Sequence, residues 1–190
     1  MRDGANVKVT ELIVDTADLS HISDEQFQSR TEGLHVSAII QHIMVTSGLS
    51  EANDFTSNDL NLFAIIGRLW EQMLANVMFP APRYVRPGEL ECEGIYGSPD
   101  AVDTHDACLM EFKVTWKSSR HEIGTFFKYM LQVKAYCYML GLTRVRLYVC
   151  FVCGNYKPPL PQFRAWDIEF SPHEIKDAWR MILTNAKEMT

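Results

Sequence analysis

The sequence predicts an α/β protein with a central mixed β-sheet, flanking helices and added helices toward both ends. Apolar residues recur at helical spacing over 58–78 and again over 122–140. Between these stretches, short runs of β character separated by a turn occupy 94–113. A further alternating strand pattern follows over 144–152, so helices and strands succeed one another along the chain.

Length and composition indicate one globular domain. At 190 residues the chain is expected to divide into an N-terminal helical extension over 1–57, a core over 58–153 and a C-terminal loop and helix over 154–190. Its hydrophobic content of 47% is ordinary for a folded protein. There is no basic region followed by an apolar run, and apolar runs are too short to cross a bilayer. We therefore expect a cytoplasmic protein that does not interact with a membrane.

The N-terminal third is expected to contain one clear helix. The pattern over 7–14 predicts a strand, and the polar stretch over 15–34 predicts a loop or a short helix. Ser37 is a suitable N-cap for a helix through Ser47, which Gly48 would end.

The helix over 58–78 is expected to bury one face and to end before Pro80. The apolar residues that define this face are Leu62, Ile65, Ile66, Leu69, Met73 and Leu74. Glu71 lies off the centre of the face, where it either reaches a metal at the helix flank or faces water.

The C-terminal region is expected to add a strand and a helix. An extended, proline-rich loop over 155–162 leads to an edge strand over 163–170. Ser171 then caps the final helix, and Glu174 occupies the third helical position of a capping box.

The stretch over 94–113 combines residues that are unusual at a sheet edge. On the strand over 108–114, side chains alternate between faces, so Glu111 and Lys113 point the same way. Asp100 follows the turn on the neighbouring strand. Two adjacent carboxylates repel each other unless a cation lies between them, and oxygen ligands suit magnesium or manganese. The same residues also fit a solvated strand with a surface Glu–Lys pair.

Asp100 followed by Glu111-Phe112-Lys113 resembles the PD-(D/E)XK motif of the restriction-endonuclease-like nucleases. Pro99 matches the first letter of that motif. The predicted order of helix, three strands, helix and strand is similar to the core of that fold. The resemblance therefore implies a restriction-endonuclease-like core.

Two further matches resemble one branch of this superfamily. Gln132 and Tyr136 stand four residues apart on one helix face and are similar to the Q-x-x-x-Y motif of the RecB-like and lambda-exonuclease-like branch. Upstream, Gly67 to Glu71 resembles the first motif of that branch. Four short matches thus occur in the family order, and the chain looks like a phage-type exonuclease.

The resemblance implies a Mg2+- or Mn2+-dependent nuclease that hydrolyses phosphodiester bonds in DNA. Its implied metal ligands are Glu71, Asp100, Glu111 and the main-chain carbonyl of Phe112. Lys113 would orient the attacking water or stabilise charge on the phosphorane, and Gln132 and Tyr136 would position the scissile strand or the metal-bound waters.

Other acids nearby offer alternative ligands. Asp103 is the main rival of Asp100, which we prefer because it follows Gly-x-Pro as the family pattern expects. Glu91 and Glu93 share one face of a predicted irregular hairpin over 83–93, and either could approach the metal.

The net charge of −6 does not by itself indicate a nucleic-acid-binding protein, but bases are concentrated over 111–146. The residues expected to contact DNA are Trp116, Lys117, Arg120 and Lys128. Trp116 fits the core equally well, and Lys128 and Lys134 fit a solvated helix face.

Five cysteines without a framework spacing favour buried thiols over disulfides. Cys150 and Cys153 form a C-x-x-C. Some relatives of the resembled family hold an iron–sulfur cluster with four cysteines, one near the N-terminus. Here none precedes Cys92, so no such cluster is expected.

The predicted role is an exonuclease that processes DNA ends for recombination or repair, in the host cytoplasm if the protein is phage-encoded. The resemblance also implies a single-strand annealing protein as a partner, and a homo-oligomer. Two alternatives stay open: a structure-specific endonuclease, and a non-catalytic DNA-binding or assembly protein that keeps the nuclease fold.

Overall fold

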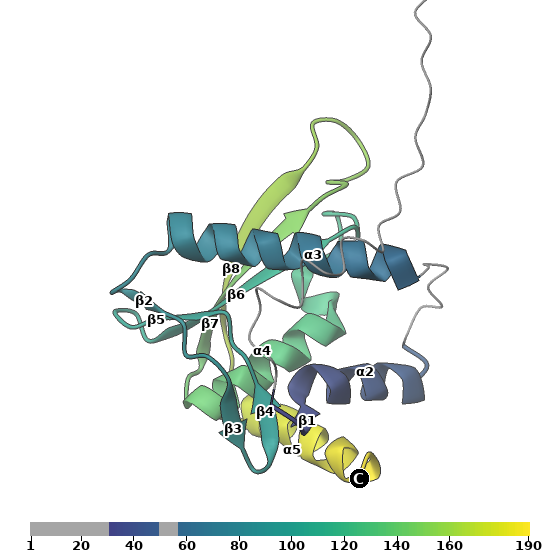
Figure 1. Cartoon of the computed structure of the whole chain (residues 1–190), viewed down its shortest axis with the longest axis vertical. Helices are drawn as coiled ribbons and strands as arrows, with labels where there is room; N and C mark the ends of the chain where they lie inside the picture. Colours follow the sequence, from purple (N-terminus) through teal and green to yellow (C-terminus); the bar gives the residue numbers. More distant parts are fainter. Residues whose placement is uncertain (1–30, 50–56) are drawn as a thin grey trace, which may run out of the picture.

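The computed structural model describes residues 31–49 and 57–190 (Figure 1). The strand predicted over 7–14 and most of the polar stretch over 15–34 lie outside the described residues. A mixed five-stranded sheet forms the centre, and its strand order is β2-β5-β6-β7-β8. Its members are β2 (Tyr84–Val85), β5 (Ala101–Asp103), β6 (Cys108–Thr115), β7 (Arg144–Phe151) and β8 (Gln162–Glu169). Only the β6–β7 pair of this sheet is parallel, as expected from the helix between these two strands.

A second, smaller sheet lies beside the first. It consists of β1 (Leu34–His35), β4 (Ile95–Gly97) and β3 (Leu90–Cys92), with β4 in the middle. The hairpin predicted over 83–93 is therefore displaced: Tyr84 and Val85 join the main sheet, and the hairpin joins β3 to β4. Its turn places Glu93 and Gly94 at positive φ, which the sequence pattern did not indicate.

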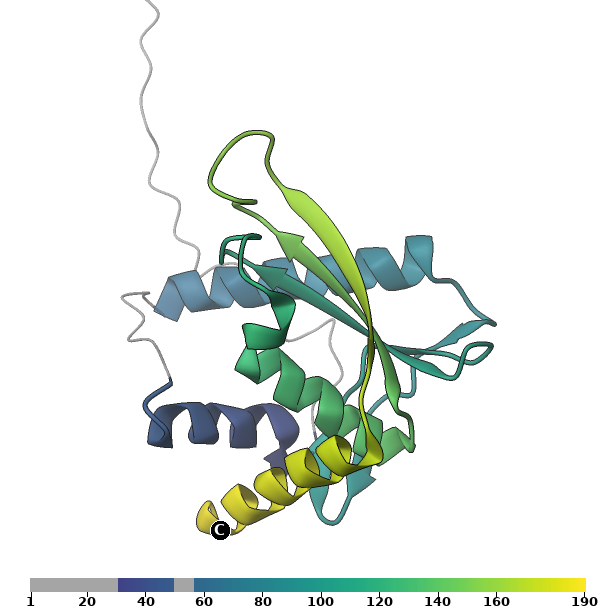
Figure 2. The same ribbon diagram turned by 180° about the vertical axis from the view of Figure 1, so that it is seen from behind.

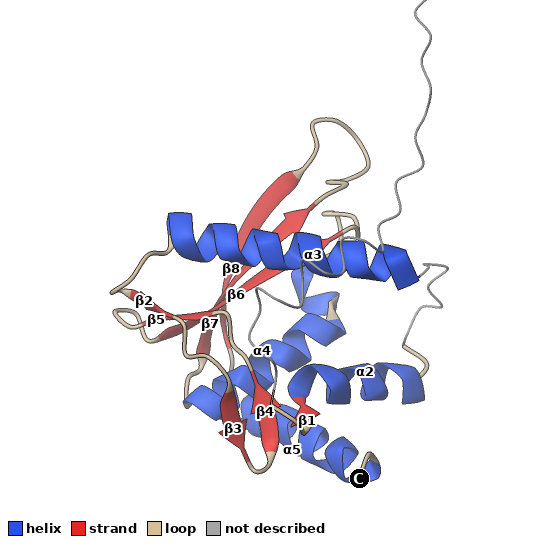
Figure 3. Ribbon diagram, in the orientation of Figure 1, coloured by secondary structure: helices blue, strands red, loops and turns tan. Residues whose placement is uncertain are grey.

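The helices are α2 (Val36–Thr46), α3 (Ser57–Met73) with its π-helical continuation η2 (Leu74–Met78), the short 3-10 helix η3 (Ile123–Thr125), α4 (Phe127–Leu140) and α5 (Pro172–Glu188). Figures 1 and 2 show α3 across one face of the main sheet and α4 on the other. Helices α2 and α5 pack against α4, so the element types form successive layers (Figure 3). Among the described residues, no helix is long and apolar enough to cross a membrane.

Two predicted helix starts had different outcomes. The capping box of the last helix is confirmed, because Ser171 Oγ accepts from the Glu174 N–H and Glu174 accepts from the Ser171 N–H. The N-cap of α2 is wrong, because His35 is the N-cap and Ser37 lies inside the helix. The reason is that His35 still pairs with Tyr96 in β1, so its backbone is extended and the helix begins at once after it.

The buried face predicted for the long helix is wrong at Leu69 and Met73 and is confirmed at Leu74. Leu69 is 57% exposed and Met73 is 44% exposed, whereas Leu74 and Ala75 are buried. The chain widens into the π-helical segment at Leu74, and a π turn takes more residues than an α turn. This segment begins after both exposed residues, so their exposure has another cause: the buried stripe of α3 runs through Trp70 and Leu74, one position along from Leu69 and Met73.

Strand β6 supports both cores of the protein. Leu109 packs into the larger core, with α2, α4, α5 and the odd-numbered residues of β7. Met110 and Phe112 pack into a smaller core under α3, with Leu74 and Ala75. Because β6 is fixed from both faces, the polar residues between these positions have a defined place.

A network of charged residues closes one end of the main sheet. Asp103 is fully buried, and Arg83 donates to it from Nε at 3.0 Å and from Nη2 at 2.7 Å. The N–H groups of His105 and Asp106 donate to the same carboxylate. These hydrogen bonds, that of Arg83 above all, lower the pKa of Asp103 from 3.8 to about 2. Asp103 is thus a structural carboxylate that holds the β5–β6 turn.

We expect Asp103→Asn to lower the free energy of unfolding by about 2 kcal/mol at neutral pH, because hydrogen bonds to a buried charge are lost. A lowered folded-state pKa means that this contribution is complete above 3.8 and is lost as the pH falls toward 2. The difference between wild type and variant should therefore shrink over this window. Urea unfolding followed by circular dichroism would measure it.

Asp177→Asn makes the same chemical change at a half-exposed carboxylate on α5 and serves as the control. It should change stability little, because exposed ion pairs contribute little. Equal stability of the Asp103→Asn variant and the wild type at neutral pH would contradict the structural role of Asp103.

Candidate active site

The structure brings Asp100 and Glu111 together on neighbouring strands. The last pair of the β5–β6 ladder is Ala101 with Met110, so the next position in register places Asp100 across from Glu111. Asp100 Oδ2 accepts from the N–H of Phe112 at 2.7 Å, which fixes its carboxylate at the open end of the ladder. Because side chains alternate between the two faces, Asp103 and Glu111 point to opposite faces of the sheet.

Lys113 lies next to this pair, as the E-x-K spacing predicts. Its Nζ donates to Glu111 Oε1 at 2.5 Å. Glu111 is 1% exposed, and no described residue donates a hydrogen bond to its other oxygen, Oε2. A buried carboxylate oxygen without a partner is energetically costly, so this position favours an additional cation or donor.

Electrostatics in the site reflect the crowding of like charges. Burial, and then the negative charge of Glu111, raise the pKa of Asp100 well above its ordinary value. Burial also raises the pKa of Glu111, although the charge and the hydrogen bond of Lys113 oppose this. Burial would lower the pKa of Lys113, but the nearby carboxylates reverse this effect and raise it. The lysine therefore balances only part of the negative charge.

Helix α4 presents Gln132 and Tyr136 to the site on one face. Gln132 Nε2 donates to Tyr136 Oη at 3.0 Å, as expected for residues four apart. Tyr136 is buried, and its pKa is raised by burial and by the charge of Glu111. The predicted Q-x-x-x-Y pair therefore lies within electrostatic range of the carboxylates.

The close approach of α4 to β4 depends on Gly97. A Cβ at this position would lie 2.9 Å from Cε1 of Tyr136 and 2.8 Å from Sδ of Met139. Gly97 thus lets the tyrosine pack against the strand that leads to Asp100. The sequence pattern recorded this glycine only as part of a turn.

Glu71 contributes charge to the site but is held by another residue. Its negative charge raises the pKa of both Asp100 and Glu111. However, Arg86 Nη2 donates to Glu71 Oε1 at 3.1 Å. Within residues 31–49 and 57–190, no three histidine, cysteine, aspartate or glutamate side chains converge closely enough to hold a metal ion. Two carboxylates are in place, and the third is engaged with an arginine.

The other predicted or alternative ligands, Phe112, Glu91 and Glu93, make contacts elsewhere in the fold. The ring of Phe112 faces the opposite core, where it stacks on Phe79 at 5.6 Å, and its main-chain carbonyl stays a predicted ligand. Glu93 accepts from Trp179 Nε1 at 2.8 Å and anchors the β3–β4 hairpin to α5. Glu91 accepts from the N–H of Gly94 in the same hairpin. These two glutamates are thus occupied in the hairpin.

The predicted DNA contacts divide into two groups. Trp116 is half-buried, and its ring lies 4.2 Å from the ring of Phe63 in a tilted arrangement. Its carbonyl accepts from Tyr156 Oη, so the structure favours the packing role of Trp116. Lys117 and Arg120 are exposed on the loop after β6.

Lys128 is exposed, and its pKa is lowered by burial of part of the side chain and by the charge of Lys113. It stands four residues before Gln132, so α4 places a basic residue on the same row as Gln132 and Tyr136. Lys128 is therefore close enough to Lys113 for the two positive charges to repel each other.

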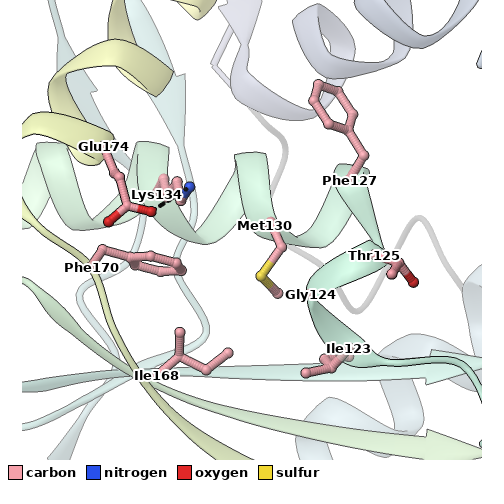
Figure 4. A pocket seen from close by; sticks show the side chains of 9 residues that line it. All are labelled: Ile123, Gly124, Thr125, Phe127, Met130, Lys134, Ile168, Phe170 and Glu174. Atoms are coloured by element: carbon pink, nitrogen blue, oxygen red, sulfur yellow. Dashed lines mark hydrogen bonds and ion pairs between the residues drawn. The ribbon is translucent and has the colours of Figure 1, made fainter.

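A hollow of about 530 Å³ lies on another face of α4 (Figure 4). Its lining residues are Ile123, Gly124, Thr125, Phe127, Met130, Lys134, Ile168, Phe170 and Glu174. Lys134 Nζ lies 3.4 Å from Glu174 Oε1 and 4.8 Å from the ring centre of Phe170. Lys134 is therefore tied to α5, and the hollow contains none of the predicted catalytic residues.

The five cysteines are free thiols. Cys150 is buried near the end of β7, and Cys153 is half-buried in the turn that follows. Cys137 is buried in α4, and burial, together with the charge of Cys108, raises its pKa to about 12. At such a pKa this thiol stays protonated and is a packing residue.

No protein-family model matches the sequence, and no curated protein sequence matches it. Solved structures share its fold at low identity. SSO0001 has a TM-score of 0.51 at 12% identity, covering 89% of this chain and 84% of that chain. LHK-Exo, an alkaline exonuclease from Laribacter hongkongensis, has in its complex with dAMP a TM-score of 0.50 at 14% identity, covering 92% and 90%. A phage-related exonuclease from Haemophilus somnus 129PT has a TM-score of 0.48 at 13% identity, covering 80% and 79%.

At these identities the likeness concerns the fold. The chain has the α/β fold of SSO0001 and LHK-Exo over most of its length. The predicted fold class is confirmed, and the predicted resemblance to lambda-type exonucleases is confirmed at the level of the fold.

We expect Asp100→Asn to raise the free energy of unfolding of the cation-free protein by on the order of 1 kcal/mol. The amide oxygen can still accept from Phe112, while the repulsion from Glu111 disappears. Because the folded-state pKa of Asp100 is raised, the difference should vanish at acidic pH, where the wild-type carboxyl is protonated. Urea unfolding with a chelator present would measure it.

Asp103→Asn provides the matched control, because the same substitution there should have the opposite sign. A loss of stability in the Asp100→Asn variant as large as that in the Asp103→Asn variant would show that Asp100 is an ordinary structural carboxylate.

Proposed function

We propose that the protein is a metal-dependent deoxyribonuclease that hydrolyses phosphodiester bonds, with Asp100, Glu111 and Lys113 at its centre. One observation carries this proposal. Buried Glu111 lies across from half-buried Asp100, its oxygen Oε2 has no hydrogen-bond partner among the described residues, and Lys113 is the lysine that balances the charge of the two carboxylates. Such a pair is unfavourable in a purely structural role, and it suits the binding of a hard cation.

The donor set fits Mg2+ or Mn2+, because carboxylate and carbonyl oxygens are the ligands these ions prefer. The residues that would hold the ion are Asp100, Glu111 and Glu71, with the carbonyl of Phe112 as a further ligand. A bound ion would lower the pKa of a water and stabilise negative charge on the phosphate. Glu71 would first have to leave Arg86.

Lys113 would act as a hydrogen-bond donor and a fixed positive charge. Its raised pKa keeps the proton on Nζ at neutral pH, so it does not serve as the general base. With one N–H directed at Glu111, the ammonium has donors left for the attacking water or for a phosphate oxygen. This role stabilises charge that develops during cleavage.

The row of side chains on α4 formed by Lys128, Gln132 and Tyr136 would hold the scissile strand against the carboxylates. Tyr136 keeps its proton because its pKa is raised, and its oxygen already accepts from Gln132. Its hydroxyl hydrogen is therefore available to a phosphate or to a water in the site. Lys128, one turn earlier, would contact a neighbouring phosphate.

The proposal favours an exonuclease that acts on DNA ends in recombination or repair. The fold of LHK-Exo, an alkaline exonuclease solved with dAMP, supports this choice over other nuclease types. A single-strand annealing partner and a homo-oligomer belong to the same proposal and rest on the motif resemblance. Cleavage of closed circles would instead identify an endonuclease with the same chemistry.

We expect Lys113→Ala to reduce the cleavage rate at least about 100-fold, because a preorganised donor to the developing charge is removed. The assay would use linear duplex, linear single strands and closed circles with Mg2+ or Mn2+. Lys134→Ala removes a lysine from another face of α4 and should retain wild-type activity. Full activity of the Lys113→Ala protein would exclude this site, and inactivity of the wild type on every substrate would leave a DNA-binding role.

We expect Glu71→Gln to raise the Mn2+ concentration required for half-maximal cleavage, because one anionic ligand is lost. The effect should be about tenfold or more, as for other changes in a ligand set. A titration of activity against Mn2+ would measure it. If the Mn2+ concentration for half-maximal cleavage is unchanged, Glu71 is not a metal ligand and serves only as the partner of Arg86.

A further inference from the structure

We propose that Arg86 is a cation-sensitive switch: it pairs with Glu71 while no divalent cation is bound, and it turns to a DNA phosphate when a cation takes Glu71. This inference rests on the proposed nuclease function and adds a residue that neither the sequence motifs nor the fold assigns to the site.

The position of Arg86 places it near the end of β5 that adjoins Asp100, on the face of the sheet toward α3. Strand β2 pairs with β5 through Tyr84 with Asp103 and Val85 with Val102. The next position in register places Arg86 beside Ala101, the neighbour of Asp100 in the sequence. From this edge of the sheet the Arg86 side chain contacts α3, where its Nη2 lies 3.1 Å from Glu71 Oε1.

The Arg86–Glu71 ion pair is weak enough for a cation to disrupt. Its side chains are 45% and 35% exposed, so water competes for both partners. Arg86 donates to Glu71 from one nitrogen, whereas Arg83 donates to the fully buried Asp103 from two. Exposed pairs of this kind contribute little stability, and a divalent ion held by two further carboxylates can displace one of them.

Glu71 cannot serve both partners at once. Its charge already reaches Asp100 and Glu111 and raises their pKa. Yet in the described part of the chain the three acids do not form a cluster that could hold a metal ion. The arginine thus keeps the third carboxylate apart from the other two, and its own positive charge also disfavours an incoming cation.

Release of Arg86 would create a new phosphate contact. A guanidinium without its carboxylate partner, next to a bound nucleic acid, forms bidentate hydrogen bonds to phosphate oxygens. Lys113 is engaged with Glu111 on the other face of the sheet, so Arg86 would approach the DNA from the β2 edge. Cation binding and DNA binding would then strengthen each other, because linkage between two sites is reciprocal.

The first test measures Mn2+ binding without DNA by isothermal titration calorimetry. Arg86→Gln should bind Mn2+ about three- to fivefold tighter than wild type, the gain expected when an exposed competing pair is removed. Arg86→Lys keeps the positive charge and should stay closer to wild type. Arg180→Gln removes an exposed arginine on α5 and should leave Mn2+ affinity unchanged.

A double-mutant cycle separates competition for Glu71 from simple charge repulsion. In a Glu71→Gln background the tightening caused by Arg86→Gln should largely disappear, because there is no carboxylate left to compete for. If Arg86→Gln tightens Mn2+ binding equally in both backgrounds, the arginine acts only through its charge and the switch is wrong.

The second test measures DNA binding by fluorescence anisotropy in a Lys113→Ala background, where the substrate is not cut. Mn2+ should increase DNA affinity there, and Arg86→Gln should reduce this increase at least about threefold. The two readouts thus move in opposite directions, tighter for the cation and weaker for the DNA. A merely structural arginine would weaken both.

The outcomes distinguish the inference from its premise. If no variant and no wild-type protein binds Mn2+, the proposed metal site is wrong and the switch falls with it. If the wild type binds Mn2+ and cleaves DNA, while Arg86→Gln leaves Mn2+ affinity unchanged or weaker, the nuclease function stands and the switch is overturned.

Discussion

The repulsion between Asp100 and Glu111 is the constraint around which the structure is arranged. Half-buried Asp100 and buried Glu111 meet at the end of the β5–β6 ladder, and both have raised pKa values. One Phe112 N–H and one Lys113 ammonium are the contacts that hold them there. A fold that keeps such a pair must stabilise it through the rest of the molecule, as sites built for chemistry commonly do.

That support comes from packing on both faces of one strand. The ring of Phe112 and its neighbour Met110 fix β6 from the α3 side, and Leu109 fixes it from the α4 side. Gly97 lets Tyr136 approach the strand that leads to Asp100. Burial of apolar side chains on both faces of β6 thus stabilises the folded state and offsets the unfavourable repulsion between the two carboxylates.

The sequence predicted local features well and long-range ones poorly. Alternation fixed the shared face of Glu111 and Lys113, and helical spacing fixed the Gln132–Tyr136 pair, because both depend on neighbours in the chain. The exposure of Leu69 did not follow, since packing against the smaller core selects the neighbouring apolar stripe of Trp70 and Leu74. Arg86 was missed because its partner lies fifteen residues away on another element, and no spacing rule links the two.

The β5–β6 turn has a consequence for the order in which the site forms during folding. Asp100 and Glu111 are joined by a short hairpin, so little loop entropy is lost when they meet. The parallel pairing of β6 with β7, by contrast, requires the whole crossover through α4. The entropy of loop closure therefore favours pairing of β5 with β6 before pairing of β6 with β7, so the hairpin that joins the two carboxylates needs neither α4 nor Tyr136 to form.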